Sequence, residues 1–192
     1  MASKEYGNTR AITPTTQAIK ASRREYEKYL ESNIFDKDLS FFVEDGGGYL
    51  LYAKDRKMDN YEYNAATLMA YKGYPIRMTP EGGNGYYLTI INGKKKYGDG
   101  RIALTSYEQR SPKAANYATA RKTVENAINH ARKKGAQIAV IYDYSRSFKP
   151  ADIKHGCEHY VRNNEKKRYK SVNWVIVISG SGNVHEWDLN KK

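Results

Sequence analysis

The basic residues of this chain are concentrated between Asn92 and Lys134, in a segment that also contains groups able to transfer protons. The segment holds eleven Lys or Arg against three acidic residues, which is two thirds of the chain's net charge of +12. A strong local positive field attracts phosphate backbones. We therefore expect a nucleic acid as the partner and a phosphodiester bond as the site of any chemistry.

Cleavage of RNA without a metal needs a base for the 2′-hydroxyl, an acid for the leaving 5′-oxygen, and cations that stabilise the growing charge. Glu81 or Asp99 is the candidate base. The cations and the candidate acids lie in the same part of the chain: Lys96, Arg101 and Lys113 for the phosphate, and Tyr107, Glu108 or His130 for the acid.

Binding without catalysis uses a second set of side chains around the same segment. Tyrosines flank a predicted turn at Asn92-Gly93, and strand alternation leaves at least one free to stack on an unpaired base, although core packing is the competing interpretation. The candidate nucleic-acid-binding residues are Lys94, Lys95, Arg110, Asn116, Arg121, Tyr86, Tyr87 and Tyr97.

No pattern in the chain indicates a metal, a cofactor or a membrane. Cys157 is the single cysteine, and His155 and His159 have metal-ligand spacing but lack a nearby third ligand. The longest apolar runs are far shorter than the roughly 20 residues that span a bilayer. The N-terminus has no apolar signal-peptide core, so we expect a cytoplasmic protein. We also expect neither a cofactor nor a metal.

Local signals place the elements around the basic segment. Asp59 resembles a helix N-cap, and Gly73 resembles the residue that ends that helix. A strand over Tyr74–Met78, a hairpin turning at Asn92-Gly93 and a strand over Arg101–Thr105 follow. Ser111-Pro112 then predicts the start of a long helix that ends at Gly135.

The remaining segments complete an α+β fold. A helix from Thr15 or Thr16 to about Ser32 and a hairpin around Gly46-Gly47-Gly48 precede the basic segment. After it come a strand over Gln137–Tyr142, a helix to about Asn163 that Gly156 interrupts, and a closing hairpin. We predict a single mixed or antiparallel sheet flanked by helices. The predicted domains are an N-terminal extension, residues 1–58, with a disordered start, a helix and a β-hairpin, and a nuclease domain, residues 59–192.

Two stretches carry a resemblance to a known family: Tyr63 to Glu81, and the turn Asn92-Gly93-Lys94. Together with the order of elements up to Trp187, they resemble the C-terminal tRNase domains of contact-dependent growth inhibition (CdiA-type) toxins. Such domains look like members of the barnase/EndoU/colicin/RelE group of ribonucleases. The resemblance implies metal-independent cleavage of tRNA or other structured RNA, an immunity or inhibitor protein as partner, and delivery into a target cell's cytoplasm.

The sequence departs from that family in one place. Members usually carry a Glu-Ile-Lys-like run on the strand after the turn, whereas this chain has Lys95-Lys96-Tyr97-Gly98-Asp99. The pattern of metal-dependent nucleases, with Asp and Glu-x-Lys on adjacent strands, is broken for the same reason. The alternative is therefore a non-catalytic nucleic-acid-binding or structural protein of a phage or mobile element.

The clustered charge predicts RNA binding with a steep salt dependence. Each phosphate that a lysine or arginine neutralises releases counterions and adds roughly 0.7 to 0.9 to the slope of log affinity against log salt. Binding measured at low and at physiological salt checks this. An affinity that barely changes would show that the basic segment only keeps the protein soluble.

Overall fold

The computed structural model describes residues 14–80, 87–91, 94–112, 120–145, 148–164 and 172–190. Within these residues the helices are α1 (Thr16–Leu30), α2 (Asn60–Tyr71), α3 (Ala120–Lys134) and α4 (Pro150–Asn164). The strands are β1 (Phe35–Phe42), β2 (Tyr49–Ala53), β3 (Pro75–Met78), β4 (Tyr87–Ile91), β5 (Lys94–Tyr97), β6 (Gly100–Ile102), β7 (Thr105–Arg110), β8 (Ile138–Asp143), β9 (Trp174–Ser179) and β10 (Val184–Asp188). No helix in this part of the chain is long and apolar enough to cross a membrane.

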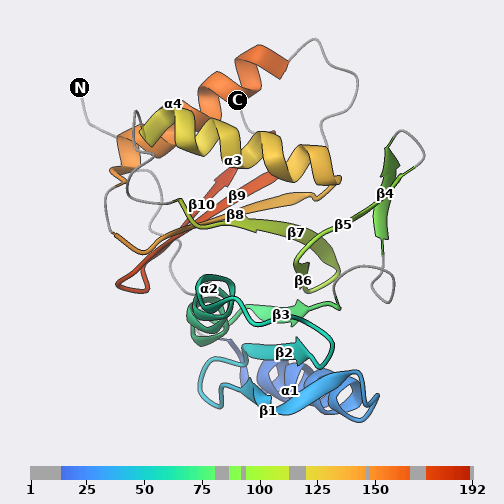
Figure 1. Ribbon diagram of the computed structural model, residues 1–192. Helices are drawn as coiled ribbons and strands as arrows, with labels where there is room; N and C mark the ends of the chain where they lie inside the picture. The colour runs from blue at the N-terminus through green and yellow to red at the C-terminus, as the bar shows by residue number, and fades with distance from the viewer. Residues whose placement is uncertain are drawn as a thin grey trace.

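Eight of the strands form one mixed sheet in the order β1-β2-β3-β6-β7-β8-β9-β10. The pairs β2–β3, β7–β8 and β8–β9 are parallel, and the others are antiparallel. β4 and β5 pair with each other in a separate two-stranded sheet, which projects beside the C-terminal end of α3 (Figure 1). The α+β class and the mixed sheet flanked by helices are confirmed, with the N-terminal hairpin joined to the sheet through β2.

Helices cover both faces of the sheet and bury three apolar clusters (Figure 1). Met69 of α2 packs with Tyr107 and Val140 on one face. Ile128 of α3 packs with Ile141 and residues of α4 on the other face. α1 covers the hairpin β1–β2 through a smaller cluster. The central strand β7 therefore lies between helical layers, with one set of side chains directed to α2 and the other to α3.

Several local predictions are confirmed in atomic detail. The Asp59 carboxylate accepts hydrogen bonds from the backbone N–H groups of Tyr61 and Glu62, at 2.9 and 3.1 Å, as an N-cap does. Gly73 follows α2 with φ +90°, which an L-residue rarely adopts. The antiparallel pair β4–β5 also forms as predicted.

Other local predictions are wrong or lie outside the described residues. The predicted strand over Arg101–Thr105 is interrupted at Ala103, whose φ is +52°, and a separate strand that was not predicted, β7, begins at Thr105. Gly156 lies within α4 and does not interrupt it. A Cβ at this position would meet Val124 at 2.6 Å, so the glycine allows α3 to approach α4 closely. The first turns of the predicted long helix include residues 113–119, so this part of the prediction lies outside the described residues.

The three consecutive glycines before β2 differ in what their backbone positions allow. A Cβ on Gly48 would meet the Ala70 carbonyl oxygen at 2.0 Å, whereas a Cβ on Gly46 would have contacts of 3.7 Å or more. We expect Gly48→Ala to lower the free energy of unfolding by roughly 3 kcal/mol and Gly46→Ala by less than about 1 kcal/mol. Urea unfolding of both variants measures this, and equal losses would contradict the close approach of β2 to α2.

Candidate active site

Strand β7 presents charged side chains to α3 and uncharged ones to α2. Tyr107 packs in the apolar cluster beneath α2, and the Gln109 side chain donates to the Tyr61 carbonyl oxygen of that helix at 3.1 Å. Glu108 and Arg110 point to the opposite face and contact His130 of α3. Strand alternation thus places a carboxylate and a guanidinium, two residues apart, against one helix.

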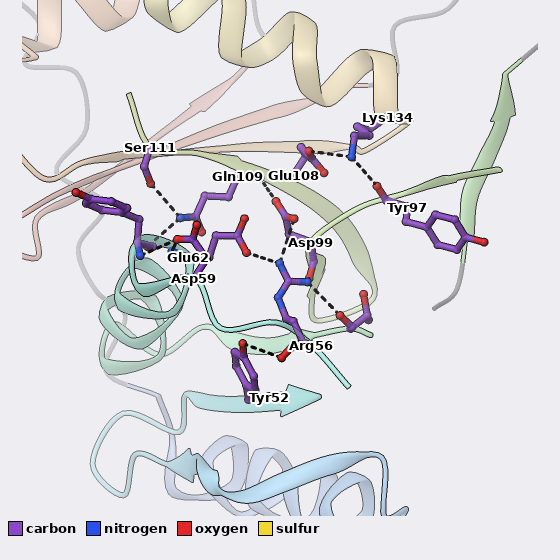
Figure 2. Close-up of polar contacts among 12 residues, drawn as sticks. Tyr52, Arg56, Asp59, Glu62, Tyr97, Asp99, Glu108, Gln109, Ser111 and Lys134 are labelled. Carbon is purple, nitrogen blue, oxygen red and sulfur yellow. Dashed lines mark hydrogen bonds and ion pairs between the residues drawn. The ribbon is translucent and has the colours of Figure 1, made fainter. Parts of the chain in front are cut away.

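Four side chains meet at this point, and we call Glu108, Arg110, His130 and Lys134 the β7–α3 cluster. His130 Nε2 lies 2.8 Å from Glu108 Oε1, and Lys134 Nζ lies 3.5 Å from the same oxygen. Arg110 NH2 lies 3.1 Å from His130 Nδ1. His130 and Lys134 are four residues apart on α3, so both reach the same strand. Figure 2 shows Lys134 between Glu108 and the Tyr97 carbonyl oxygen.

The contacts of His130 determine which of its nitrogens carries the proton. A guanidinium can only donate hydrogen bonds, so Nδ1 accepts from Arg110. Nε2 therefore carries the hydrogen of the neutral ring and donates it to Glu108 Oε1. In this form the imidazole has one basic nitrogen, and it faces Arg110.

Burial governs the protonation of both acid–base groups. Glu108 is only 5% exposed, and burial raises its pKa to about 8, with the negative charge of Asp99 adding to the rise and Lys134 opposing it. Its second oxygen, Oε2, has no hydrogen-bond partner among the described residues. Burial also lowers the pKa of His130, and the neighbouring charges of Arg110 and Lys134 lower it further. Both groups thus favour their neutral forms near neutral pH.

A second polar group lies on the α2 side of β7, around the buried guanidinium of Arg56. Arg56 forms ion pairs with Glu62 and, at 3.2 Å, with Asp99 (Figure 2). The other Asp99 oxygen accepts from the Gln109 backbone N–H at 2.7 Å. Both oxygens of Asp99 therefore already accept hydrogen bonds, one of them within an ion pair, which counts against its predicted role as the base.

Tyr107 does not lie where the predicted acid would have to be. Its side chain is fully buried, and burial raises the pKa of its hydroxyl far above the ordinary value. A hydroxyl in this position is not accessible to a substrate, which counts against Tyr107 as the acid. Glu108 and His130, the two other candidates for the acid, do lie together.

The predicted cations are only partly brought together. Lys94, Lys95 and Lys96 lie on β5, which meets the β7–α3 cluster where Lys134 Nζ donates to the Tyr97 carbonyl oxygen at 3.4 Å. Arg101 instead donates to the Leu104 carbonyl oxygen at the turn between β6 and β7, and Arg121 lies in the first turn of α3. Predictions that fall outside the described residues or side chains are those for Glu81, Tyr86, Tyr87, Lys113 and Asn116.

Sequence reasoning missed Lys134, Arg56 and Glu62. Lys134 has a sequence signal, since it lies one helical turn after His130. Arg56 has none, because it lies in a turn of charged residues, Lys54-Asp55-Arg56-Lys57, that is typical of an exposed loop. Its guanidinium is buried through contacts with Thr79 and Asp99, which are distant in sequence, as well as with Glu62.

The residues nearest to the Asp and Glu-x-Lys pattern of metal-dependent nucleases are Asp99, Glu108 and Arg110. Asp99 directly precedes β6, Glu108 lies on the adjacent strand β7, and Arg110 stands where that pattern has lysine. The carboxylates are nevertheless bonded to Arg56, His130 and Lys134. Among the described residues no group of three or more His, Cys, Asp or Glu side chains could hold a metal ion.

Comparisons with known proteins find little. No protein-family model matches the chain, and no curated protein matches it. One chain of the solved CdiA-CT/CdiI toxin and immunity complex from Burkholderia pseudomallei is similar in structure, with a TM-score of 0.47 and 19% identity over 72% of this chain and 98% of that one. A likeness of this size assigns no activity to the chain.

The raised pKa of Glu108 predicts a pH-dependent cost in stability. Between the ordinary pKa of 4.5 and about 8, the unfolded chain has lost this proton while the folded protein keeps it. The folded state binds more protons, so stability falls as pH rises through this window. Glu108→Gln keeps an oxygen that accepts from His130 and has no charge to lose. We expect the variant to be more stable at pH 8, by roughly 1–3 kcal/mol, or about 2–4 °C in Tm per kcal/mol.

Thermal unfolding at several pH values checks this prediction. The gain of Glu108→Gln should shrink as the pH falls and vanish well below pH 4.5, where Glu108 is protonated in both states of the natural protein. A variant that is less stable than the natural protein at pH 8 would show that the ionised carboxylate stabilises the fold.

Proposed function

We propose that this protein is an endoribonuclease that cleaves tRNA or other structured RNA without a metal, with the β7–α3 cluster as its active site. The observation that supports this most is the pairing of His130 with the buried Glu108, flanked by Arg110 and Lys134. A carboxyl group that accepts the Nε2 hydrogen fixes the tautomer of a histidine and leaves the other imidazole nitrogen available as a base. Two cations beside that base suit a phosphodiester substrate.

In the proposed reaction His130 acts as the base and Glu108 as the group that orients it. A bound phosphate competes for Arg110, because guanidinium–phosphate hydrogen bonds are charge-assisted, and this frees Nδ1. Nδ1 then takes the proton of the 2′-hydroxyl, and the 2′-oxygen forms a bond to phosphorus. The bond from phosphorus to the 5′-oxygen breaks, and that oxygen takes a proton from solvent. The products are a 2′,3′-cyclic phosphate and a 5′-hydroxyl.

The wider surroundings of the cluster suit a polyanionic substrate. The three consecutive lysines lie on β5, part of the two-stranded sheet that projects beside the C-terminal end of α3 (Figure 1). Lys134 of α3 donates to the Tyr97 carbonyl oxygen at the end of β5. Such a field attracts RNA over several ångströms and raises its association rate. The proposal includes a toxin-like role in a cytoplasm, either the producing cell's or a target cell's, and an inhibitor protein that restrains the activity.

The direct test is incubation of the purified protein with total tRNA in EDTA. Discrete fragments that end in a 2′,3′-cyclic phosphate are expected. Cleavage that disappears in EDTA and returns with magnesium would contradict the metal-independent route. RNA binding without cleavage of any RNA would favour the non-catalytic nucleic-acid-binding protein instead.

Removal of His130 gives a sharper test because the chain contains a matched control. His159 of α4 also pairs with a glutamate, Glu125, at 2.9 Å, and the two histidines are 30% and 35% exposed. We expect His130→Gln to slow RNA cleavage by roughly 10²- to 10⁴-fold, the usual contribution of a general base. His159→Gln should cleave at the natural rate. Equal losses in both variants would point to a general effect on folding.

The pH dependence of cleavage should report the base. The pKa of His130 is lowered from its ordinary value of 6.5, and the base must be unprotonated to act. The acidic limb of kcat/KM is therefore expected below pH 6.5, and it should be absent from the residual activity of His130→Gln. A limb that keeps its position in that variant would assign the base to another group.

A further inference from the structure

Arg56 is a charged residue that the proposed reaction does not use, although it is buried close to it. Its side chain is only 1% exposed. NH1 donates to the carbonyl oxygens of Thr79 and Asp99, at 3.1 and 3.0 Å, and NH2 bonds the carboxylates of Glu62 and Asp99. Thus one guanidinium, from the turn after β2, contacts α2, the end of β3 and the residue before β6 (Figure 2).

Asp99 connects Arg56 to the backbone of β7 through hydrogen bonds. Asp99 Oδ1 contacts Arg56, while Oδ2 accepts from the Gln109 backbone N–H at 2.7 Å. The Asp99 backbone N–H donates to the Tyr107 carbonyl oxygen at 3.1 Å. Asp99 therefore holds the backbone of β7 on both sides of Glu108, the residue that orients His130.

We propose that Arg56 is a positioning residue for the β7–α3 cluster: by holding Asp99 against β7, it fixes the place and the charge surroundings of the Glu108–His130 pair. This inference rests on the proposed function for its catalytic meaning. It makes the turn that follows the N-terminal hairpin a necessary part of the site, because the guanidinium comes from residues 54–57 and the chemistry from β7 and α3.

The charges around the pair decide what loss of Arg56 should do. Asp99 and Glu62 face Glu108 from the α2 side and favour its protonated form, and Lys134 of α3 opposes them. Arg110 of β7 together with Lys133 and Lys134 of α3 disfavour protonation of His130, while Asp99 favours it. Arg56 bonds both Asp99 and Glu62. Without it their negative charge is uncompensated, so protonated His130 is stabilised.

The test is an NMR titration of the His130 ring in the full chain, with the signal assigned by its absence from His130→Gln. We expect Arg56→Met to raise the pKa of His130 by roughly half a unit or more, since one nearby positive charge is removed. Arg56→Lys keeps the charge and loses the planar fork, so the pKa of His130 should stay in place. Asp99→Asn removes a negative charge and should lower it.

Each outcome either supports or overturns the positioning role. If Arg56 only stabilises the fold, Arg56→Met lowers Tm and leaves the His130 titration unchanged in the folded protein. If Arg56→Met does not fold, Arg56→Gln, which also removes the charge but keeps hydrogen-bond donors for the buried carbonyl oxygens, replaces it with the same expected rise, and an unchanged titration there overturns the proposal. The titration needs no RNA cleavage, so failure of the proposed function remains distinguishable from failure of this inference.

Where the natural protein cleaves RNA, the same variants carry a second readout. The acidic limb of kcat/KM should move to higher pH in Arg56→Met, in step with the His130 titration, and should stay in place in Arg56→Lys. A rate loss at all pH values without movement of the limb would mean that Arg56 affects only the amount of folded protein.

Discussion

The buried guanidinium of Arg56 is the interaction on which the centre of this structure depends. It satisfies two carbonyl oxygens and two carboxylates that three separate segments bring to one place. Removing one partner of such a buried ion pair typically costs roughly 3–5 kcal/mol, because the remaining charge stays buried without compensation. This cost falls where β3 meets β6, between the N-terminal hairpin and the strands that carry the candidate site. The two parts of the sheet are thus joined by an ionic contact as well as by strand pairing.

The same region contains polar atoms that the fold leaves unsatisfied. Among the described residues, Arg56 Nε, Tyr107 Oη, Glu108 Oε2 and Gln109 Oε1 are buried without a hydrogen-bond partner. An unsatisfied buried polar group costs roughly 1–3 kcal/mol, so most proteins keep very few. Their concentration around Asp99 and β7 is typical of a functional site, where stability is given up for reactivity. The raised pKa of Glu108 has the same origin, since burial disfavours its charged form.

The sequence predicted those features that depend on neighbouring residues. Asp59 as an N-cap, Gly73 after α2 and the antiparallel pair β4–β5 are local, and all were found. Strand β7 was missed because Ser106-Tyr107-Glu108-Gln109-Arg110 has polar residues on both faces and resembles a loop. It is a strand only because β6 and β8 pair with it and because Glu108 and Gln109 find partners on opposite helices.

For the candidate site, the sequence likewise indicated individual residues but not the contacts between residues that are distant in the chain. Glu108 and His130 were both named as possible acids, but only the β7–α3 contact shows that they form a pair. Asp99 and Tyr107 were named from charge and proximity along the chain, and the structure places both beneath the strand, bonded or buried. Residue type can therefore suggest which side chains are candidates for catalysis. Whether a candidate can reach a substrate depends on the face of the sheet on which its side chain lies.

Lys134 of α3 contacts both β5 and Glu108 of the β7–α3 cluster. Its ammonium lies 3.5 Å from Glu108 Oε1 and donates to the Tyr97 carbonyl oxygen at the end of β5. β4 and β5 pair only with each other among the described strands, and this contact joins β5 to α3, which packs on the main sheet. In the proposed function, an RNA backbone that follows the lysines of β5 would arrive at Lys134, which also lies beside the Glu108 carboxyl group. Because binding and protonation share this one ammonium, a phosphate that draws Lys134 away from Glu108 also removes a charge that favours the ionised carboxylate. In the proposed function, substrate binding and the proton affinity of the Glu108–His130 pair are therefore coupled through this side chain.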